Sequence, residues 1–176
     1  MKIQGATALV TGANGGLGRH LAQQLRDRGP DVYAGARNPG SVDLAGVTPV
    51  QLDIADPASV TAATEAAKGV SILVNNAGIE TGATLLNGDL GEIRREFDTN
   101  FFGTLAVTRA FAPQLGEHEE SYVLNVPSVL SWLNVPWLGG YSASKSAETA
   151  CSNCSASSWT LYHSRPKISV SMRSMR

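Results

Sequence analysis

The sequence has few cysteines, few aromatic residues and no surplus of charge of either sign. Aromatic side chains make up 6% of the 176 residues, and 14 Lys and Arg stand against 15 Asp and Glu. The chain therefore lacks the basic surface that binding to nucleic acid requires. Cys151 and Cys154 form a C-x-x-C, which suits a redox pair or half of a zinc site. No second pair exists and the three histidines are dispersed, so we expect two free thiols and no metal.

Long hydrophobic runs are also missing. No apolar stretch approaches the roughly 20 residues of a membrane span, and the N-terminus lacks the small-residue cleavage site of a signal peptide. We therefore expect a cytoplasmic protein without a membrane partner. The hydrophobic content of 43% suits one globular domain.

Short apolar segments alternate with segments of helical pattern along most of the chain. Strands are predicted at 6–10, 31–36, 48–52, 70–74 and 122–126. Helices are predicted from residue 16 to the Gly-Pro at 29–30, from 57 to about 68, over 90–115 with a break near Thr99 and Asn100, and from residue 142 onward. This order indicates an α/β fold with a doubly wound, Rossmann-like parallel sheet.

A glycine-rich turn lies between the first predicted strand and the first predicted helix. Its spacing, T-G-x-x-x-G-x-G over residues 11–18, differs from the common G-x-G-x-x-G and by itself also fits an ordinary tight turn. Such a turn before a helix N-terminus favours pyrophosphate binding. At the end of the second strand, where an acidic residue would hold the ribose of NAD, the sequence has Arg37. An arginine there suits the 2'-phosphate of NADP, although it also fits a solvated surface position.

Further polar residues follow the fourth and fifth predicted strands. Asn-Asn-Ala-Gly occupies 75–78, at the carboxyl edge where ligands bind in such sheets. Tyr141 and Lys145 stand four apart at a helix start, so both side chains project from one face. A nearby ammonium stabilises a phenolate, which lets a tyrosine exchange a proton near neutral pH. The hydroxyl of Ser128 is placed to hold a carbonyl oxygen beside that tyrosine.

Together these motifs resemble the short-chain dehydrogenase/reductase family from about residue 5 to residue 147. The resemblance implies a catalytic set of Asn100, Ser128, Tyr141 and Lys145. It also implies that the cofactor is NADP(H) and is bound by Gly12, Asn14, Gly16, Leu17, Gly18, Arg37, Asp53, Ile54, Asn76, Ala77 and Gly78. In that mechanism a hydride passes between nicotinamide and a carbonyl carbon while Tyr141 exchanges a proton with the oxygen. The role of Asn100, holding a water chain that resupplies the proton, rests wholly on the resemblance.

The chain departs from the family pattern at two places. Pro127 replaces a small polar residue before the serine but leaves Ser128 in register. Beyond about residue 150 the sequence turns serine-rich, and the family's sixth and seventh strands cannot be found. We therefore expect a Rossmann domain over 1–148 and a poorly ordered tail over 149–176, from truncation or a frameshift, with a natural disordered tail as the alternative. The family's homo-oligomer is doubtful here, and we expect little turnover.

The leading function is an NADP(H)-dependent oxidoreductase that interconverts a ketone and a secondary alcohol. The apolar segment 130–138, which contains Trp132 and Trp137, favours a small hydrophobic substrate, although both tryptophans also fit a cover for the sheet or a subunit contact. The alternative is a catalytically impaired nucleotide-binding or sensor module that retains the fold. Intact Ser128, Tyr141 and Lys145 argue against this alternative, and the missing C-terminal part argues for it.

Overall fold

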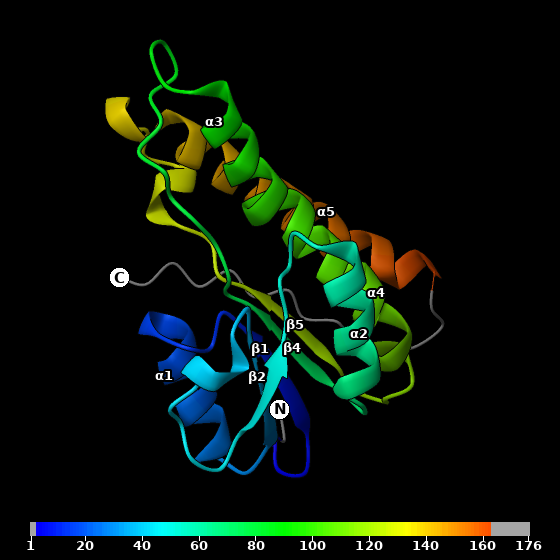
Figure 1. The fold of residues 1–176 in the computed structure, drawn as a ribbon. Helices are drawn as coiled ribbons and strands as arrows, with labels where there is room; N and C mark the ends of the chain where they lie inside the picture. Colours follow the sequence, from blue (N-terminus) through cyan, green and yellow to red (C-terminus); the bar gives the residue numbers. More distant parts are fainter. Residues whose placement is uncertain (1–2, 163–176) are drawn as a thin grey trace.

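The computed structural model describes residues 3–162, and for residues 153–162 it describes the backbone alone. A five-stranded sheet, in the order β3-β2-β1-β4-β5, runs through the molecule with every neighbouring pair parallel (Figure 1). The strands are β1 (Thr7–Thr11), β2 (Asp31–Ala36), β3 (Thr48–Gln51), β4 (Ile72–Asn75) and β5 (Tyr122–Asn125). All five predicted strands are confirmed, with ends displaced by no more than two residues.

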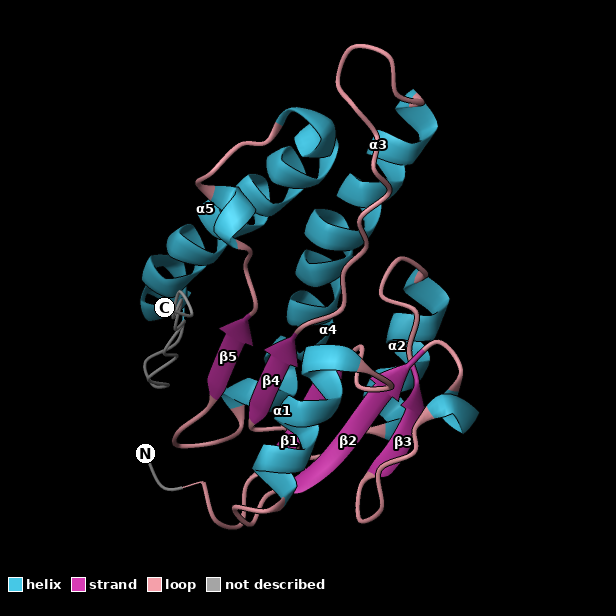
Figure 2. Cartoon of the chain, turned by 90° about the vertical axis from the view of Figure 1, so that its left-hand side faces the viewer, coloured by secondary structure: helices cyan, strands magenta, loops and turns pink. Residues whose placement is uncertain are grey.

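The strand order reverses between β1 and β4. The chain moves outward from β1 to β3, then returns to the other side of β1 for β4 and β5. Because every pair is parallel, the carboxyl ends of all five strands lie at one edge of the sheet, as the arrowheads of β2, β4 and β5 show in Figure 2. In a doubly wound sheet, ligands bind outside the carboxyl ends of the strands at this switch point. A ligand site is therefore expected at the loops that follow β1 and β4.

Helices cover both faces of the sheet. On one face lies α1 (Gly16–Arg26), and on the other lie α2 (Pro57–Ala66) and α4 (Thr104–Gly116) (Figure 2). The start of α2 is capped by its own sequence: the Asp56 side chain accepts a hydrogen bond from the Ala58 N–H, and Pro57 takes the first helical position.

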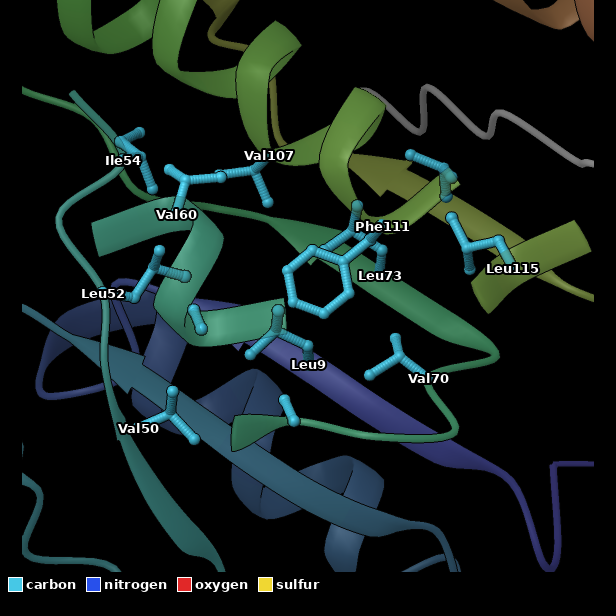
Figure 3. Packing of buried hydrophobic residues seen from close by; sticks show 13 residues of the cluster. Leu9, Val50, Leu52, Ile54, Val60, Val70, Leu73, Val107, Phe111 and Leu115 are labelled. Carbon is cyan, nitrogen blue, oxygen red and sulfur yellow. The ribbon is translucent and has the colours of Figure 1, made fainter. Parts of the chain in front are cut away.

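The larger hydrophobic cluster fills the space between the sheet and the pair α2 and α4. Leu9 and Leu73 project from β1 and β4, and Phe111 and Leu115 meet them from α4 (Figure 3). All four side chains are fully buried. Strands covered on both faces read as continuous apolar runs, which explains why the sequence predicts them well.

The predicted long helix is continuous but changes its winding at its middle. It consists of α3 (Leu90–Phe97), a π-helical turn over Asp98–Gly103, and α4. The predicted break near Asn100 is thus a π-helical segment in which the helix does not stop. Such segments frequently occur at functional sites. Asn100 lies in this turn with its side chain fully buried.

The last helix, α5 (Gly139–Tyr162), extends past the predicted domain boundary at residue 148. Extending an existing helix costs far less than starting one. Hydroxyl groups also bond to the preceding turn, since Ser146 Oγ donates to the Ser142 carbonyl at 2.8 Å and Ser152 Oγ donates to the Glu148 carbonyl at 2.8 Å. Serine content alone therefore did not end the helix. The rest of the predicted tail, 163–176, lies outside the described residues.

Strand β5 forms one border of the described part of the sheet, where it pairs with β4 and with no other described strand. Across residues 3–162, no helix is long and apolar enough to cross a membrane.

Candidate active site

The turn between β1 and α1 packs directly on the loop that follows β4. Thr11 Oγ1 accepts hydrogen bonds from the Asn76 and Ala77 N–H groups, each at 3.0 Å, and Asn76 Nδ2 donates to the Thr11 carbonyl at 3.0 Å. These bonds join two loops that are about 65 residues apart in sequence. The carboxyl ends of β1 and β4 therefore form one rigid platform.

Glycine is required in this turn for two different reasons. Gly12 has a φ of +66°, which side chains rarely adopt. Gly18 lies in the first turn of α1, where a Cβ would collide with the Gly12 carbonyl oxygen and the Asn76 side chain. Gly18 thus lets α1 approach the loops closely. The first helical turn presents unpaired N–H groups beside this platform, which suits an anionic group.

A cavity of about 580 Å³ opens at the platform. Its volume falls within the range of small-molecule and cofactor sites. Eight of the eleven predicted cofactor-binding residues line it: Gly12, Asn14, Arg37, Asp53, Ile54, Asn76, Ala77 and Gly78. Of the other three, Leu17 lines a second cavity, Gly18 has the packing role just described, and Gly16 lines neither cavity.

Arg37 is the unpaired arginine of this region. Arg19, beside the glycine turn, forms an ion pair with Asp43 at 2.6 Å, and its hydrogen bond and charge hold the pKa of that carboxyl below its ordinary value. Arg95 also lines the cavity and pairs with Glu92 at 2.8 Å. Arg37 is exposed and forms no ion pair with any residue in the described range. Its guanidinium is available for an anion.

The second cavity, of about 310 Å³, is bounded by Ser128, Tyr141 and Lys145 together. Asn76, Gly78, Ile79 and Glu80 line both cavities. The fold therefore brings three of the four predicted catalytic residues to one hollow that adjoins the predicted cofactor hollow.

The short helical turn that Ser128 caps is joined to α5 by hydrogen bonds of Ser131. Ser128 Oγ accepts from the Leu130 N–H at 3.1 Å and caps a short helical turn, Val129–Ser131. Ser131 Oγ donates to the Lys145 carbonyl at 3.1 Å, and Ser146 Oγ donates to the Ser131 carbonyl at 2.9 Å. The Ser128 hydroxyl proton stays available to a group in the cavity.

The Lys145 ammonium, at the border of the smaller cavity, has two polar partners. Nζ donates to the Val126 carbonyl at 3.2 Å and lies 2.7 Å from Glu148 Oε2. A Cβ at Gly78 would approach Lys145 Nζ to 3.5 Å and Asn100 Oδ1 to 3.1 Å. Because Gly78 has no side chain, the space next to the ammonium stays open.

Asn100 acts here as a brace, away from the cavity walls. Its Oδ1 accepts from the Ile79 N–H at 2.8 Å, and its Nδ2 donates to the Ile79 carbonyl at 2.9 Å and to Ser144 Oγ at 3.0 Å. The side chain joins the loop after β4 to α5 and lines neither cavity. Its predicted role in proton supply stays a prediction.

Sequence reasoning missed Glu148. This carboxyl is 2% exposed, and burial raises its pKa while the Lys145 ammonium opposes that shift. Its position three residues after Lys145 places both on one helix face, a spacing that could have revealed the pair. Among the described residues, no group of three or more His, Cys, Asp or Glu side chains is arranged to hold a metal ion.

Comparison with known proteins decides the family. The family model for short chain dehydrogenase matches residues 6–171. The chain belongs to the short-chain dehydrogenase/reductase family. A relative from Bacteroides thetaiotaomicron, named 3-ketodihydrosphingosine reductase, is 32% identical over 149 residues, which cover 82% of this chain and 55% of the relative. The chain spans about half the length of the first curated relatives it matches.

Solved structures of this family share the fold. A short chain dehydrogenase from Burkholderia cenocepacia in complex with NADP is 34% identical with a TM-score of 0.88, covering 97% of this chain and 71% of that one. A family member from Burkholderia phymatum in complex with NAD is 27% identical, also with a TM-score of 0.88, covering 97% and 65%. Members of similar fold thus bind either dinucleotide, and the comparisons leave the preference of this chain open.

Proposed function

We propose that the chain forms the cofactor-binding and proton-transfer site of an NADP(H)-dependent oxidoreductase that interconverts a ketone and a secondary alcohol. One observation carries the proposal: Ser128, Tyr141 and Lys145 surround a cavity that shares four lining residues with a larger, glycine-bordered cavity. A proton-exchanging phenol beside a dinucleotide-sized hollow is what carbonyl reduction requires.

The residues at the larger cavity fit a dinucleotide. Gly12 and Gly18 bring the backbone close, where a Cβ would not fit, and the helix N-terminus behind them favours the pyrophosphate. Arg37 carries an unpaired guanidinium at the end of β2, where it would bind a 2'-phosphate through charge-assisted hydrogen bonds. This last contact supports NADP(H) over NAD(H).

The chain's own residues would do the following work at the smaller cavity. Ser128 donates its hydroxyl proton to the substrate oxygen and orients it. Tyr141 gives a proton to that oxygen during reduction, or takes it during oxidation. Lys145 stabilises the phenolate through its charge. When bound, the nicotinamide supplies or accepts the hydride.

Exposed apolar side chains that follow Ser128 along the chain support a hydrophobic substrate. Val129, Trp132, Leu133 and Trp137 follow Ser128 in sequence and are each at least 60% exposed. Exposed apolar side chains next to a site favour a ligand that covers them. The name of the Bacteroides relative denotes a reductase of a 3-keto compound, which agrees with a ketone. Cytoplasmic location and the weakened homo-oligomer expected for this chain stay predictions.

A nucleotide-binding module without turnover is the second candidate. The Lys145–Glu148 ion pair favours it, because the pair occupies the ammonium that the chemistry requires. Parallel fluorescence titrations with NADPH and NADH, followed by NADPH consumption with a panel of ketones, test both. The first proposal expects tighter NADPH binding and consumption with apolar ketones. Equal or tighter NADH binding would refute the cofactor preference, and preference for charged sugars would refute the substrate class.

A further inference from the structure

The ion pair between Glu148 and Lys145, which lines one cavity with Tyr141, is buried. The Lys145 and Glu148 side chains are 5% and 2% exposed, and their charged atoms are 2.7 Å apart. The other ion pairs among the described residues have at least one side chain that is more than a third exposed. The pair Lys68–Glu65 has the same three-residue spacing but is 60% and 75% exposed.

The surroundings leave the ammonium little freedom. Of its three N–H donors, one meets the Val126 carbonyl at the end of β5 and one meets Glu148. A single donor remains for the cavity that Tyr141 lines. Glu148 and the Val126 carbonyl together hold the ammonium, and Glu148 takes one donor that would otherwise be free.

The contact between Lys145 and Glu148 also sets the net charge beside the smaller cavity, because an ammonium and a carboxylate together are neutral. A lone ammonium acts on a phenol over several ångströms, whereas an ammonium with a carboxylate at 2.7 Å acts as a dipole whose field falls off faster. Because both groups are shielded from water, solvent and salt weaken this effect little.

Two other carboxylates lie near Tyr141 but form no ion pair or hydrogen bond with the ammonium of Lys145. Glu80 lines the same cavity, and Glu96 Oε2 lies against Gly140. Among the described residues, the carboxylate that contacts Lys145 Nζ is that of Glu148.

The short helical turns at 129–131 and 136–138, which pack on α5, contain no ionisable side chain. In α3, Glu92 pairs with Arg95, Arg94 is exposed, and Glu96 accepts two hydrogen bonds from Thr81.

Asp98 in the π-helical turn is exposed. The charge that acts on the pKa of the Glu148 carboxyl is that of Lys145, which opposes the rise caused by burial.

We propose that Glu148 is a positioning residue that restrains the active site by neutralising Lys145, so that the Tyr141 phenolate forms at a higher pH than it would beside an unpaired ammonium. This inference rests on the proposed function, since it concerns the same tyrosine and lysine. Glu148 does not touch the substrate in this scheme, because it acts through Lys145.

Titration of the Tyr141 phenolate tests the inference without any turnover. The phenolate signal is the ultraviolet absorbance difference between each protein and its Tyr141→Phe partner. In Glu148→Gln, which keeps the side-chain shape and removes the charge, we expect the titration midpoint to fall by about one pH unit. The control Glu65→Gln, which removes the carboxylate of the exposed lysine pair, should leave the midpoint unchanged. An unchanged or higher midpoint in Glu148→Gln overturns the inference.

A double variant shows whether Glu148 acts through Lys145. In Lys145→Met/Glu148→Gln the midpoint should rise above that of Glu148→Gln, because no ammonium remains. If the midpoint stays low without Lys145, Glu148 acts by another route and the inference fails. Should Glu148→Gln not fold by circular dichroism, Glu148→Asp withdraws the carboxylate by one methylene and should lower the midpoint by a smaller amount. No shift in that variant overturns the inference as well.

Failure of the proposed function gives a different result. Absence of NADPH binding and consumption would refute the proposed function, whatever the phenolate midpoint. A normal response to NADPH with no midpoint shift in Glu148→Gln would refute this inference alone.

Discussion

Gly18 offers the sharpest test of the cofactor platform. A Cβ there meets the backbone carbonyl of Gly12, which cannot move aside as the end of a flexible side chain would. Gly18→Ala must therefore displace α1 from the turn between residues 12 and 18. Overpacking of this kind costs about 1–3 kcal/mol of stability. The displacement also shifts the N–H groups at the start of α1, so NADPH binding should weaken at least about tenfold.

Gly15 provides the matched control. It lies in the same turn, a Cβ there has no heavy atom within 4 Å, and its φ of −173° is open to any residue. Gly15→Ala should cost no more than about 1 kcal/mol through its weaker N-cap preference and should keep NADPH binding. Urea unfolding and a fluorescence titration of both variants supply the measurements. Equal stability and equal NADPH affinity in Gly18→Ala and Gly15→Ala would refute the proposed platform.

The remaining predictions concern the charge of Arg37 after β2, the hydrogen bonds of Asn100 and the buried carboxyl of Glu148. Arg37→Ala should weaken NADPH binding by at least about tenfold and leave NADH binding unchanged, as measured by parallel titrations. Asn100→Ala removes hydrogen bonds to both backbone groups of Ile79 and should lower the free energy of unfolding, measured in urea, by about 2–3 kcal/mol. A decrease below about 0.5 kcal/mol would contradict the bracing role of Asn100. Because burial raises the pKa of the Glu148 carboxyl, the folded chain keeps that proton to higher pH than the unfolded chain. Its contribution to stability is thus complete below the ordinary carboxyl pKa and is lost as pH rises through the raised pKa, and Glu148→Gln should flatten this decline in urea midpoints.

The strands were predictable because a parallel sheet covered on both faces requires apolar runs. The segments around Leu9 and Leu73 show this pattern, and both side chains are fully buried. Strand ends were less predictable, since β4 begins at Ile72 and not at the predicted Val70. The last ladder bonds depend on neighbouring strands, which local sequence does not encode.

The helices show where local propensity fails. The sequence predicted a break near Asn100, but the chain stays helical there as a π-turn held by bonds to Ile79, which lies 21 residues away. Serine-rich composition predicted a poorly ordered tail over 149–176; the backbone of α5 continues to Tyr162, and the predicted domain boundary stays a prediction. In the π-turn an interaction beyond the local sequence determines the outcome, whereas in α5 an existing helix is extended.

The site residues that belong to ordered sequence motifs were predictable. Eight of the eleven predicted cofactor residues line one cavity, and Ser128, Tyr141 and Lys145 line the next. The spacing of Lys145 and Glu148 allows the pair, but its burial was not predicted, because it depends on the elements that pack on α5, which include α3 and the π-helical turn. A glutamate at the same spacing on the exposed face of α2 forms a surface pair of no consequence for the site.

The central claim is that the two adjoining cavities form one oxidoreductase site in which Tyr141 moves the proton. NADPH binding and NADPH consumption with apolar ketones, measured side by side in the chain and in Tyr141→Phe, test it most directly. We predict that both proteins bind NADPH equally, that the chain consumes it at the low rate expected above, and that Tyr141→Phe loses at least about a hundredfold of that rate. Equal consumption by Tyr141→Phe would contradict the account, and so would NADPH binding without consumption in either protein.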